Sequence, residues 1–319
     1  MTDRWPELDY EADRPVVESL HAYLQVLGKL PTRALPWCNH SWHLALRVVP
    51  RGFRTYPVEM ENGEAEILFD CRNSAVALET SSGFADGFDV TGQTVARFHA
   101  QFAELLKAGG VSTEVSGAPN EVEDAVPFAL DTRDRVMDRA TLRRIHRAFS
   151  DVNRVFEVFR SGFVGKSSPS HLFWGSFDLA VTRFSGREAP LHPGGFPNLS
   201  DDVTREAYSH EVASAGFWLG GGGVDEAAFY AYGYPSPERL GECPVAPQGA
   251  HWHEKLGEFV LPYAAVRASE DPEAALSAFL ESTYRAVADA GDWDRKALEI
   301  PRGLYGAPYD VEEFRRRKP

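Results

Sequence analysis

One face of a predicted strand over residues 171–183 combines a large aromatic side chain with small polar and acidic ones. Side chains alternate between the two faces of a strand, so Trp174 and Asp178 share one face. Two further predicted strands, 207–218 and 226–234, combine aromatic and small polar residues in the same way. Aromatic rings bury ligand area and a few polar groups fix the ligand's orientation, so this composition indicates a pocket wall. A sheet face covered by a helix would account for the same composition.

The residues expected to contact a ligand come from these strands and from a loop rich in proline and glycine. The loop spans residues 189–198, where three prolines restrict the backbone and two glycines permit positive φ. We expect it to form a fixed loop over the sheet. The expected ligand contacts are Trp174, Ser176, Tyr208, Trp218, Tyr230, Tyr232 and His192.

Three residues are candidates for catalysis: His210, Asp178 and Arg183. Imidazole titrates near neutral pH, so His210 is the expected acid or base, with Asp178 fixing its tautomer or accepting a hydrogen bond from substrate. The planar guanidinium of Arg183 would clamp a carboxylate or a phosphate. Structural roles stay open for all three, including a salt bridge from Arg183 to Glu206 or Glu211.

A metal site is another interpretation of the histidines. His171, His210 and Glu211 form the expected ligand set, because imidazoles and a carboxylate suit a transition metal. The adjacency of His210 and Glu211 counts against this set, since neighbours on a regular strand point to opposite faces.

The sequence lacks the familiar catalytic motifs. Gly165-Lys166-Ser167 resembles the end of a phosphate-binding loop, but Arg160 stands where that motif requires glycine. Neither a nucleophile elbow nor a dinucleotide-binding glycine motif follows a predicted strand, and no second histidine completes a zinc-protease motif. The reaction and any cofactor therefore stay unknown at this level.

Composition narrows the range of partners. The chain has 319 residues with 33 basic and 47 acidic side chains, a formal net charge of −14. That charge opposes binding to a nucleic acid backbone, and no apolar stretch reaches the roughly 18 residues of a membrane span. The N-terminus is charged where a signal peptide would be apolar, and the three cysteines are far apart. We expect a cytoplasmic protein with a small-molecule ligand; the oligomeric state stays open.

The predicted helices and strands follow the same order in the two halves of the chain. Amphipathic helices are predicted over 13–30 and 138–163, and each ends at Gly-Lys. The elements expected after them are 39–49, 64–71, 74–80 and 92–108 in the first half, and 171–183, 207–218, 226–234 and 272–289 in the second. This order predicts an α+β fold of two similar helix–antiparallel sheet–helix halves, 1–125 and 126–319, from a possible internal duplication. The pocket would lie in the second half.

Several motifs also resemble a bacterial family of uncharacterised proteins, a domain of unknown function. Residues 167–186 read SSPSHLFWGSFDLAVTRFSG and residues 205–211 read REAYSHE. Shorter matches are Trp5-Pro6, Leu20-His21, NHSWH at 39–43 and FYAY at 229–232. The resemblance spans nearly the whole chain and implies no reaction, cofactor or catalytic residue.

Three hypotheses of function follow. The first is a small-molecule enzyme that uses the aromatic and polar pocket with His/Asp acid–base chemistry. The second is a binding or sensor protein with the same pocket and no turnover. The third is a metalloenzyme with a histidine and carboxylate site.

Overall fold

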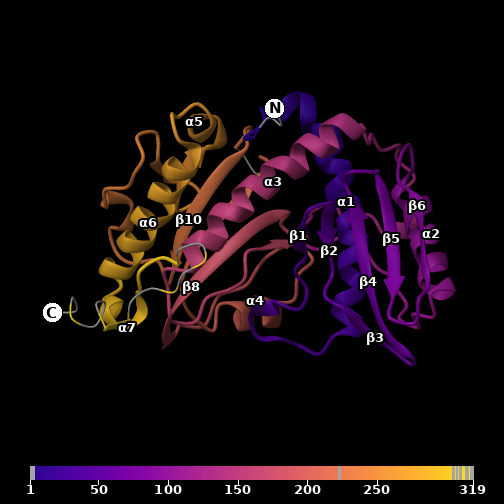
Figure 1. Cartoon of the computed structure of the whole chain (residues 1–319), viewed down its shortest axis with the longest axis horizontal. Helices are drawn as coiled ribbons and strands as arrows, with labels where there is room; N and C mark the ends of the chain where they lie inside the picture. Colours follow the sequence, from indigo (N-terminus) through magenta and orange to yellow (C-terminus); the bar gives the residue numbers. More distant parts are fainter. Residues whose placement is uncertain are drawn as a thin grey trace.

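The computed structural model describes residues 4–221 and 224–303, together with residues 306, 308, 311, 312 and 316. Helices and two antiparallel six-stranded sheets give the α+β fold that the sequence predicts. The first sheet occupies one side of the molecule and the second sheet the other, and the long helix α3 (Arg139–Arg160) runs between them (Figure 1).

The first sheet has the strand order β1-β2-β4-β5-β6, with β3 also paired to β4. Its strands are β1 (Arg47–Val49), β2 (Gly52–Arg54), β3 (Val58–Met60), β4 (Gly63–Asp70), β5 (Ala75–Thr80) and β6 (Ala85–Asp89). Helices α1 (Tyr10–Ala34) and α2 (Val95–Ala108) pack with this sheet. The buried ring of Tyr23 on α1 lies 6.5 Å from Phe69 of β4 and 4.4 Å from Phe98 of α2, measured between centroids.

The second sheet has the order β11-β12-β10-β9-β8-β7. Its strands are β7 (His171–Phe173), β8 (Asp178–Glu188), β9 (His210–Trp218), β10 (Ala228–Tyr234), β11 (His251–His253) and β12 (Glu258–Pro262). One face packs on α3 and α6 (Pro272–Ala290), where Phe149 of α3 meets Phe217 of β9 at 5.3 Å. Short helices α4 (Asp201–Ala207), α5 (Tyr263–Arg267) and α7 (Arg295–Leu298) join these elements.

The two helices on this sheet begin at capping residues. The side chain of Asp138 accepts a hydrogen bond from the Thr141 amide at 2.8 Å, and Asp271 accepts one from the Ala274 amide at 3.0 Å. Each carboxylate satisfies an amide that has no partner within the helix. Pro272 takes the first position of α6, where its missing N–H costs nothing. These signals explain why both helices start where the sequence predicts.

The strand expected over 39–49 is wrong for most of its length. Residues 39–41 form a 3₁₀ turn, with His40 and Ser41 at φ of 57° and 59°, and only Arg47–Val49 is a strand. The His40 amide donates to the carboxylate of Glu206 at 2.9 Å, and the His40 ring donates from Nδ1 to the Ala207 carbonyl at 2.9 Å. Hydrogen bonds to the end of α4 therefore fix the backbone conformation of residues 39–41, and these residues are not paired in a sheet.

The strand expected over 171–183 is divided. A turn over residues 174–177 separates β7 from β8, and the two strands pair as an antiparallel hairpin. Phe177 takes a positive φ of 59° in this turn, and Trp174 Nε1 donates to the Leu44 carbonyl at 3.0 Å. Trp174 is thus buried against the first half and leaves the face on which the sequence places it.

The other predicted helices and strands are confirmed within a few residues. Two of their ends differ: α1 continues past Gly28-Lys29 to Ala34, and residues 207–209 form the end of α4 and the turn after it instead of the start of a strand. Part of the glycine loop between β9 and β10, Gly222 and Gly223, lies outside the described residues. The two-sheet layout is compatible with two similar halves; the boundary at 125/126 and the duplication stay predictions. No helix in the described ranges is long and apolar enough to cross a membrane.

Candidate functional site

Asp178 is the centre of the face that the sequence singles out. It begins β8, is 8% exposed, and accepts hydrogen bonds from the hydroxyls of Ser176 and Tyr230. Tyr230 reaches it from β10 across Gly216 of β9, where a Cβ atom would overlap the tyrosine ring and hydroxyl. Burial raises the pKa of Asp178, and the two hydroxyl donors act in the opposite direction. Glycine at 216 is therefore required for the contact between Tyr230 and Asp178.

Aromatic rings continue from this carboxyl group along the sheet. Trp218 lies 5.3 Å from Tyr230, and Tyr230 stacks with Tyr232 at 6.0 Å. The hydroxyls of Tyr232 and Tyr208 are 2.7 Å apart, and His192 stacks on Tyr208 at 4.7 Å. All five rings are partly exposed. The structure thus brings together six of the seven expected ligand contacts, since Ser176 also belongs here and Trp174 does not.

The hydroxyl groups of these tyrosines stay protonated at neutral pH. Burial raises the pKa of Tyr208 to about 12 and raises the pKa values of Tyr230 and Tyr232 well above the usual range. Nearby acidic groups act in the same direction on all three. A neutral phenol donates one hydrogen bond and accepts others.

Two further carboxyl groups lie beside this face, and the sequence analysis missed both. Burial raises the pKa of Glu121 and of Glu258 to about 7, and the nearby Asp178 adds to each shift. Glu258 begins β12, next to β10, and the carboxylate of Glu121 packs against Gly175, where a Cβ atom would overlap it. No hydrogen bond or ion pair joins either carboxyl side chain to another described residue.

The first half of the chain holds Glu121 in place. Gln25 of α1 donates to the Asn120 carbonyl at 2.8 Å and accepts from the Asn120 amide at 3.0 Å. The same side chain donates to the Gly175 carbonyl at 3.1 Å, and His21 also contacts that carbonyl at 2.9 Å. Next along the segment, the Glu121 amide donates to the Pro197 carbonyl at 2.8 Å. Helix α1 therefore ties the β7–β8 turn and the Glu121 segment together, and the 189–198 loop is bonded to that segment.

This arrangement explains why the sequence analysis missed the two glutamates. Glu121 lies in a polar, proline-bearing segment typical of a linker, and its contacts come from residues far away in the chain. Glu258 opens a short strand of five residues that was not predicted. No local pattern of residue types distinguishes either one from a glutamate exposed to solvent.

The predicted pair of His210 and Asp178 is not formed. In the register of β8 and β9, Asp178 lies opposite Trp218 while His210 lies opposite Glu188. The two residues are thus at opposite ends of the paired strands, about 26 Å apart at roughly 3.3 Å per residue. The ring of His210 instead meets that of His40 edge-on at 5.9 Å.

Arg183 also does not join Asp178. An odd separation along β8 sends its side chain to the opposite face, between α3 and α6. There Arg183 is 1% exposed, donates to the Phe159 carbonyl at 2.6 Å, and forms an ion pair with Glu281 at 3.7 Å. Neither Glu206 nor Glu211 is its partner: Glu206 holds the His40 amide and Glu211 pairs with Arg187.

The expected metal ligands do not converge. His171 is buried beside the rings of Trp42 and Phe173, and burial lowers its pKa to about 3. Glu211 forms an ion pair with Arg187 at 2.7 Å, and His210 next to it contacts His40. Within the described part of the chain, no group of three or more His, Cys, Asp or Glu side chains could hold a metal ion. The alternation of side chains along β9 is the reason, because it separates His210 from Glu211.

Neither the curated proteins nor the solved structures gave a match. A family model matches residues 5–300, which confirms the resemblance to an uncharacterised family that the motifs indicate. The chain belongs to the family of unknown function DUF5996.

Proposed function

We propose that this protein is a small-molecule enzyme whose active site is the tyrosine–carboxyl face. This name denotes the side chains of Glu121, Ser176, Asp178, Tyr208, Trp218, Tyr230, Tyr232 and Glu258. The observation that carries the proposal is the pair Glu121 and Glu258, both with a pKa of about 7 and without an internal hydrogen-bond partner among the described residues. Perturbed carboxyl groups of this kind concentrate at functional sites.

The proposed chemistry is general acid–base catalysis by the two glutamates. A group with a pKa near the working pH is present in both protonation states, so one glutamate can donate a proton while the other accepts one. These carboxyl groups replace His210 in the role that the sequence analysis gave it. Asp178 is a positioning residue, because its carboxylate fixes the hydroxyl of Tyr230.

The charge of the face selects the class of substrate. Three carboxyl groups disfavour an anion, whereas tyrosine hydroxyls and carboxylates bind hydroxyl or amino groups. Partly exposed aromatic rings such as Trp218 and Tyr230 would bury the apolar side of such a molecule. We infer a neutral or cationic small molecule that carries hydroxyl or amino groups.

One observation favours binding without turnover. The hydroxyls of Tyr208 and Tyr232 already pair with each other at 2.7 Å, and that of Tyr230 is bonded to Asp178. These hydroxyl groups already have hydrogen-bond partners within the protein, so they can line a binding pocket without taking part in a reaction, as in a binding or sensor protein.

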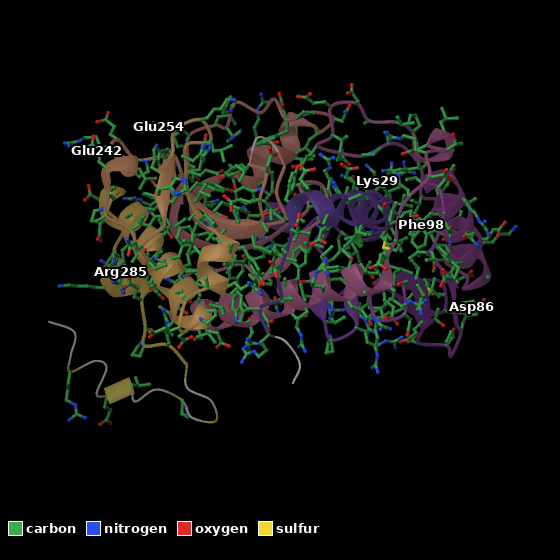
Figure 2. All side chains as sticks on the ribbon, turned by 90° about the horizontal axis from the view of Figure 1, so that it is seen from above. Lys29, Asp86, Phe98, Glu242, Glu254 and Arg285 are labelled. Atoms are coloured by element: carbon green, nitrogen blue, oxygen red, sulfur yellow. The ribbon has the colours of Figure 1, made fainter. Side chains whose placement is uncertain are left out.

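A screen followed by a turnover assay tests the proposal. Thermal-shift measurements with monosaccharides, polyols and amines would identify compounds that raise the melting temperature, and proton NMR would follow their conversion. We expect E121Q and E258Q each to slow turnover by about 100-fold, the scale of one acid or base. The control is E254Q, since Glu254 is exposed at the surface and is not one of the residues of this face (Figure 2). A compound that binds and is recovered unchanged supports the binding protein. If no compound of these classes binds, or if E121Q and E258Q bind and convert it as the unmodified protein does, the tyrosine–carboxyl face is not the active site.

A further inference from the structure

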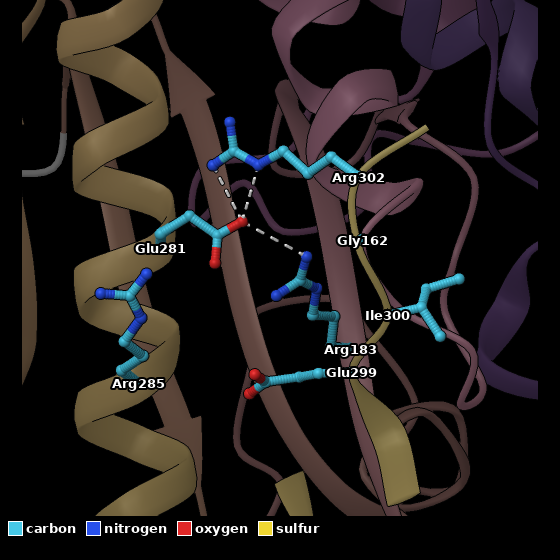
Figure 3. A pocket seen from close by; sticks show the side chains of 7 residues that line it. All are labelled: Gly162, Arg183, Glu281, Arg285, Glu299, Ile300 and Arg302. Carbon is cyan, nitrogen blue, oxygen red and sulfur yellow. Dashed lines mark hydrogen bonds and ion pairs between the residues drawn. The ribbon is translucent and has the colours of Figure 1, made fainter. Parts of the chain in front are cut away.

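A second candidate site lies on the opposite face of the same sheet. A pocket of about 320 Å³ opens between β8, α6 and the segment that follows α7. Its lining includes three arginines, Arg183, Arg285 and Arg302, and two glutamates, Glu281 and Glu299 (Figure 3). The proposed active site does not share any of these residues.

The glutamates of this pocket are already paired. Glu281 accepts a hydrogen bond from Arg302 at 3.0 Å and lies 3.7 Å from Arg183, so one carboxylate serves two guanidinium groups. Glu299 pairs at 2.5 Å with Arg295, which also contacts Asp289.

Arg285 adds a charge without a partner. It lies one turn along α6 from Glu281 and forms no hydrogen bond or ion pair with any described residue. The pocket therefore has an excess of positive charge in a chain whose net charge is −14.

The guanidinium of Arg183 is held rigidly at the base of this pocket. It stacks on the ring of Phe159 at 3.5 Å and on that of Tyr284 at 4.4 Å. Its Nη2 donates to the Phe159 carbonyl, while the buried Nε has no partner. Gly162 keeps the neighbouring backbone clear, because a Cβ atom there would lie 3.3 Å from Arg302 and 3.5 Å from Arg183. A buried donor without a partner costs free energy that a ligand oxygen can restore.

We propose that this pocket binds an oxyanion, the phosphate or carboxylate group of a small molecule. Guanidinium groups match such oxygens in pairs, and a fixed plane loses little entropy on binding. Arg285 and Arg302 supply donors from the outer wall, and Arg183 supplies a rigid positive base. The site is distinct from the tyrosine–carboxyl face, whose carboxyl groups disfavour the same ligands.

Calorimetric titration of the full-length protein tests this site. Inorganic phosphate and citrate serve as separate probes in a buffer of low ionic strength, because salt screens such contacts. We expect saturable binding of one or both, with the preferred probe showing which oxyanion class the pocket takes. R285Q should weaken that binding by about tenfold, the loss of one charge-assisted contact.

Two further variants keep the test decisive. R239Q is the control, because Arg239 is exposed and forms an ion pair with Glu242 in its own turn, outside the pocket. E281Q removes the carboxylate that competes for Arg183, so binding should tighten. The proposal is overturned if neither probe binds, or if R285Q and E281Q bind as the unmodified protein does.

Discussion

The two faces of the second sheet bury charges of opposite sign in different ways. Asp178 and Arg183 belong to the same strand, β8, and both are at least nine-tenths buried. On one face Asp178 is compensated by two hydroxyl groups, and partly exposed tyrosines surround it. On the other face Arg183 is compensated by aromatic rings, a helix carbonyl and a carboxylate 3.7 Å away.

The sheet therefore keeps these two charges apart and gives each one different electrostatic surroundings. Side-chain alternation along β8 prevents an ion pair between them. Two further carboxyl groups, those of Glu121 and Glu258, lie near Asp178. Two further arginines, Arg285 and Arg302, line the pocket that contains Arg183. One sheet can in this way present an acidic face and a basic pocket back to back.

The largest expected effect is the loss of stability when Arg183 is replaced. R183A removes a buried guanidinium, its aromatic stacking and its bond to α3, and leaves Glu281 with Arg302 alone. We expect the free energy of unfolding to fall by about 3–5 kcal/mol, the range for breaking a buried ion pair. Urea denaturation measures it, with R187A as the matched control on the same strand, since Arg187 is exposed. Equal losses in the two variants would show that burial of Arg183 is unimportant.

The free energy of unfolding should depend on pH because of Glu121 and Glu258. Burial raises the pKa values of Glu121 and Glu258 from 4.5 to about 7, so the native state retains protons that the unfolded chain has released. This contribution to stability is complete below about pH 4.5 and is lost as pH rises through 7. After allowance for partial exposure, we expect a loss of about 2 kcal/mol per group across that window.

The E121Q/E258Q double variant is the comparison for this prediction. Glutamine is neutral at every pH, so denaturation curves at pH 5 and pH 8 should differ less for the variant than for the unmodified protein. The same difference in both proteins would mean that the two glutamates titrate normally.

A smaller effect is expected at Gly216. The methyl group of G216A would overlap Tyr230 and push its hydroxyl away from Asp178, at a cost of about 1–3 kcal/mol, as for other overpacked sites. A double-mutant cycle with Y230A isolates this contact. The cost of G216A should nearly disappear when Tyr230 is alanine, and an unchanged cost would place the clash elsewhere.

The smallest expected effect comes from one hydroxyl. Y230F leaves Asp178 with Ser176 as its remaining side-chain donor and should destabilise the protein by about 1 kcal/mol. The pKa of Asp178 should also rise, because a donor that favours the carboxylate is lost. Thermal denaturation and carboxyl NMR of the variant check the two consequences; a fall in that pKa would contradict the assigned hydrogen bond.

The sequence predicts much of this fold but only part of the site. Asp138, Asp271 and Pro272 mark helix starts by local chemistry, so both helices could be placed correctly. The turn over residues 174–177 has apolar residues on both sides, so a run that reads as one strand conceals a hairpin.

Tyr230 and Tyr232 were predictable because alternation along β10 places them on one face. Tyr208 lies at the end of α4, before β9 begins, so alternation does not account for its position.

The pairing of Asp178 with His210 failed on register, because the two residues lie at opposite ends of the paired strands. Arg183, the expected anion clamp, lies on the other face of the sheet by the same alternation. Glu121 could not be predicted, because residues of α1 and of the 189–198 loop hold it.

The pKa values of Glu121 and Glu258 give the most direct test of the proposed active site. Carboxyl carbon chemical shifts of ¹³C-glutamate-labelled protein, followed from pH 3 to pH 9 with E121Q and E258Q for assignment, report each group separately. We expect two resonances with midpoints near 7, one of them missing from each variant. If every glutamate titrates between about pH 4 and pH 5, the ordinary range for that side chain, the tyrosine–carboxyl face holds no acid–base pair.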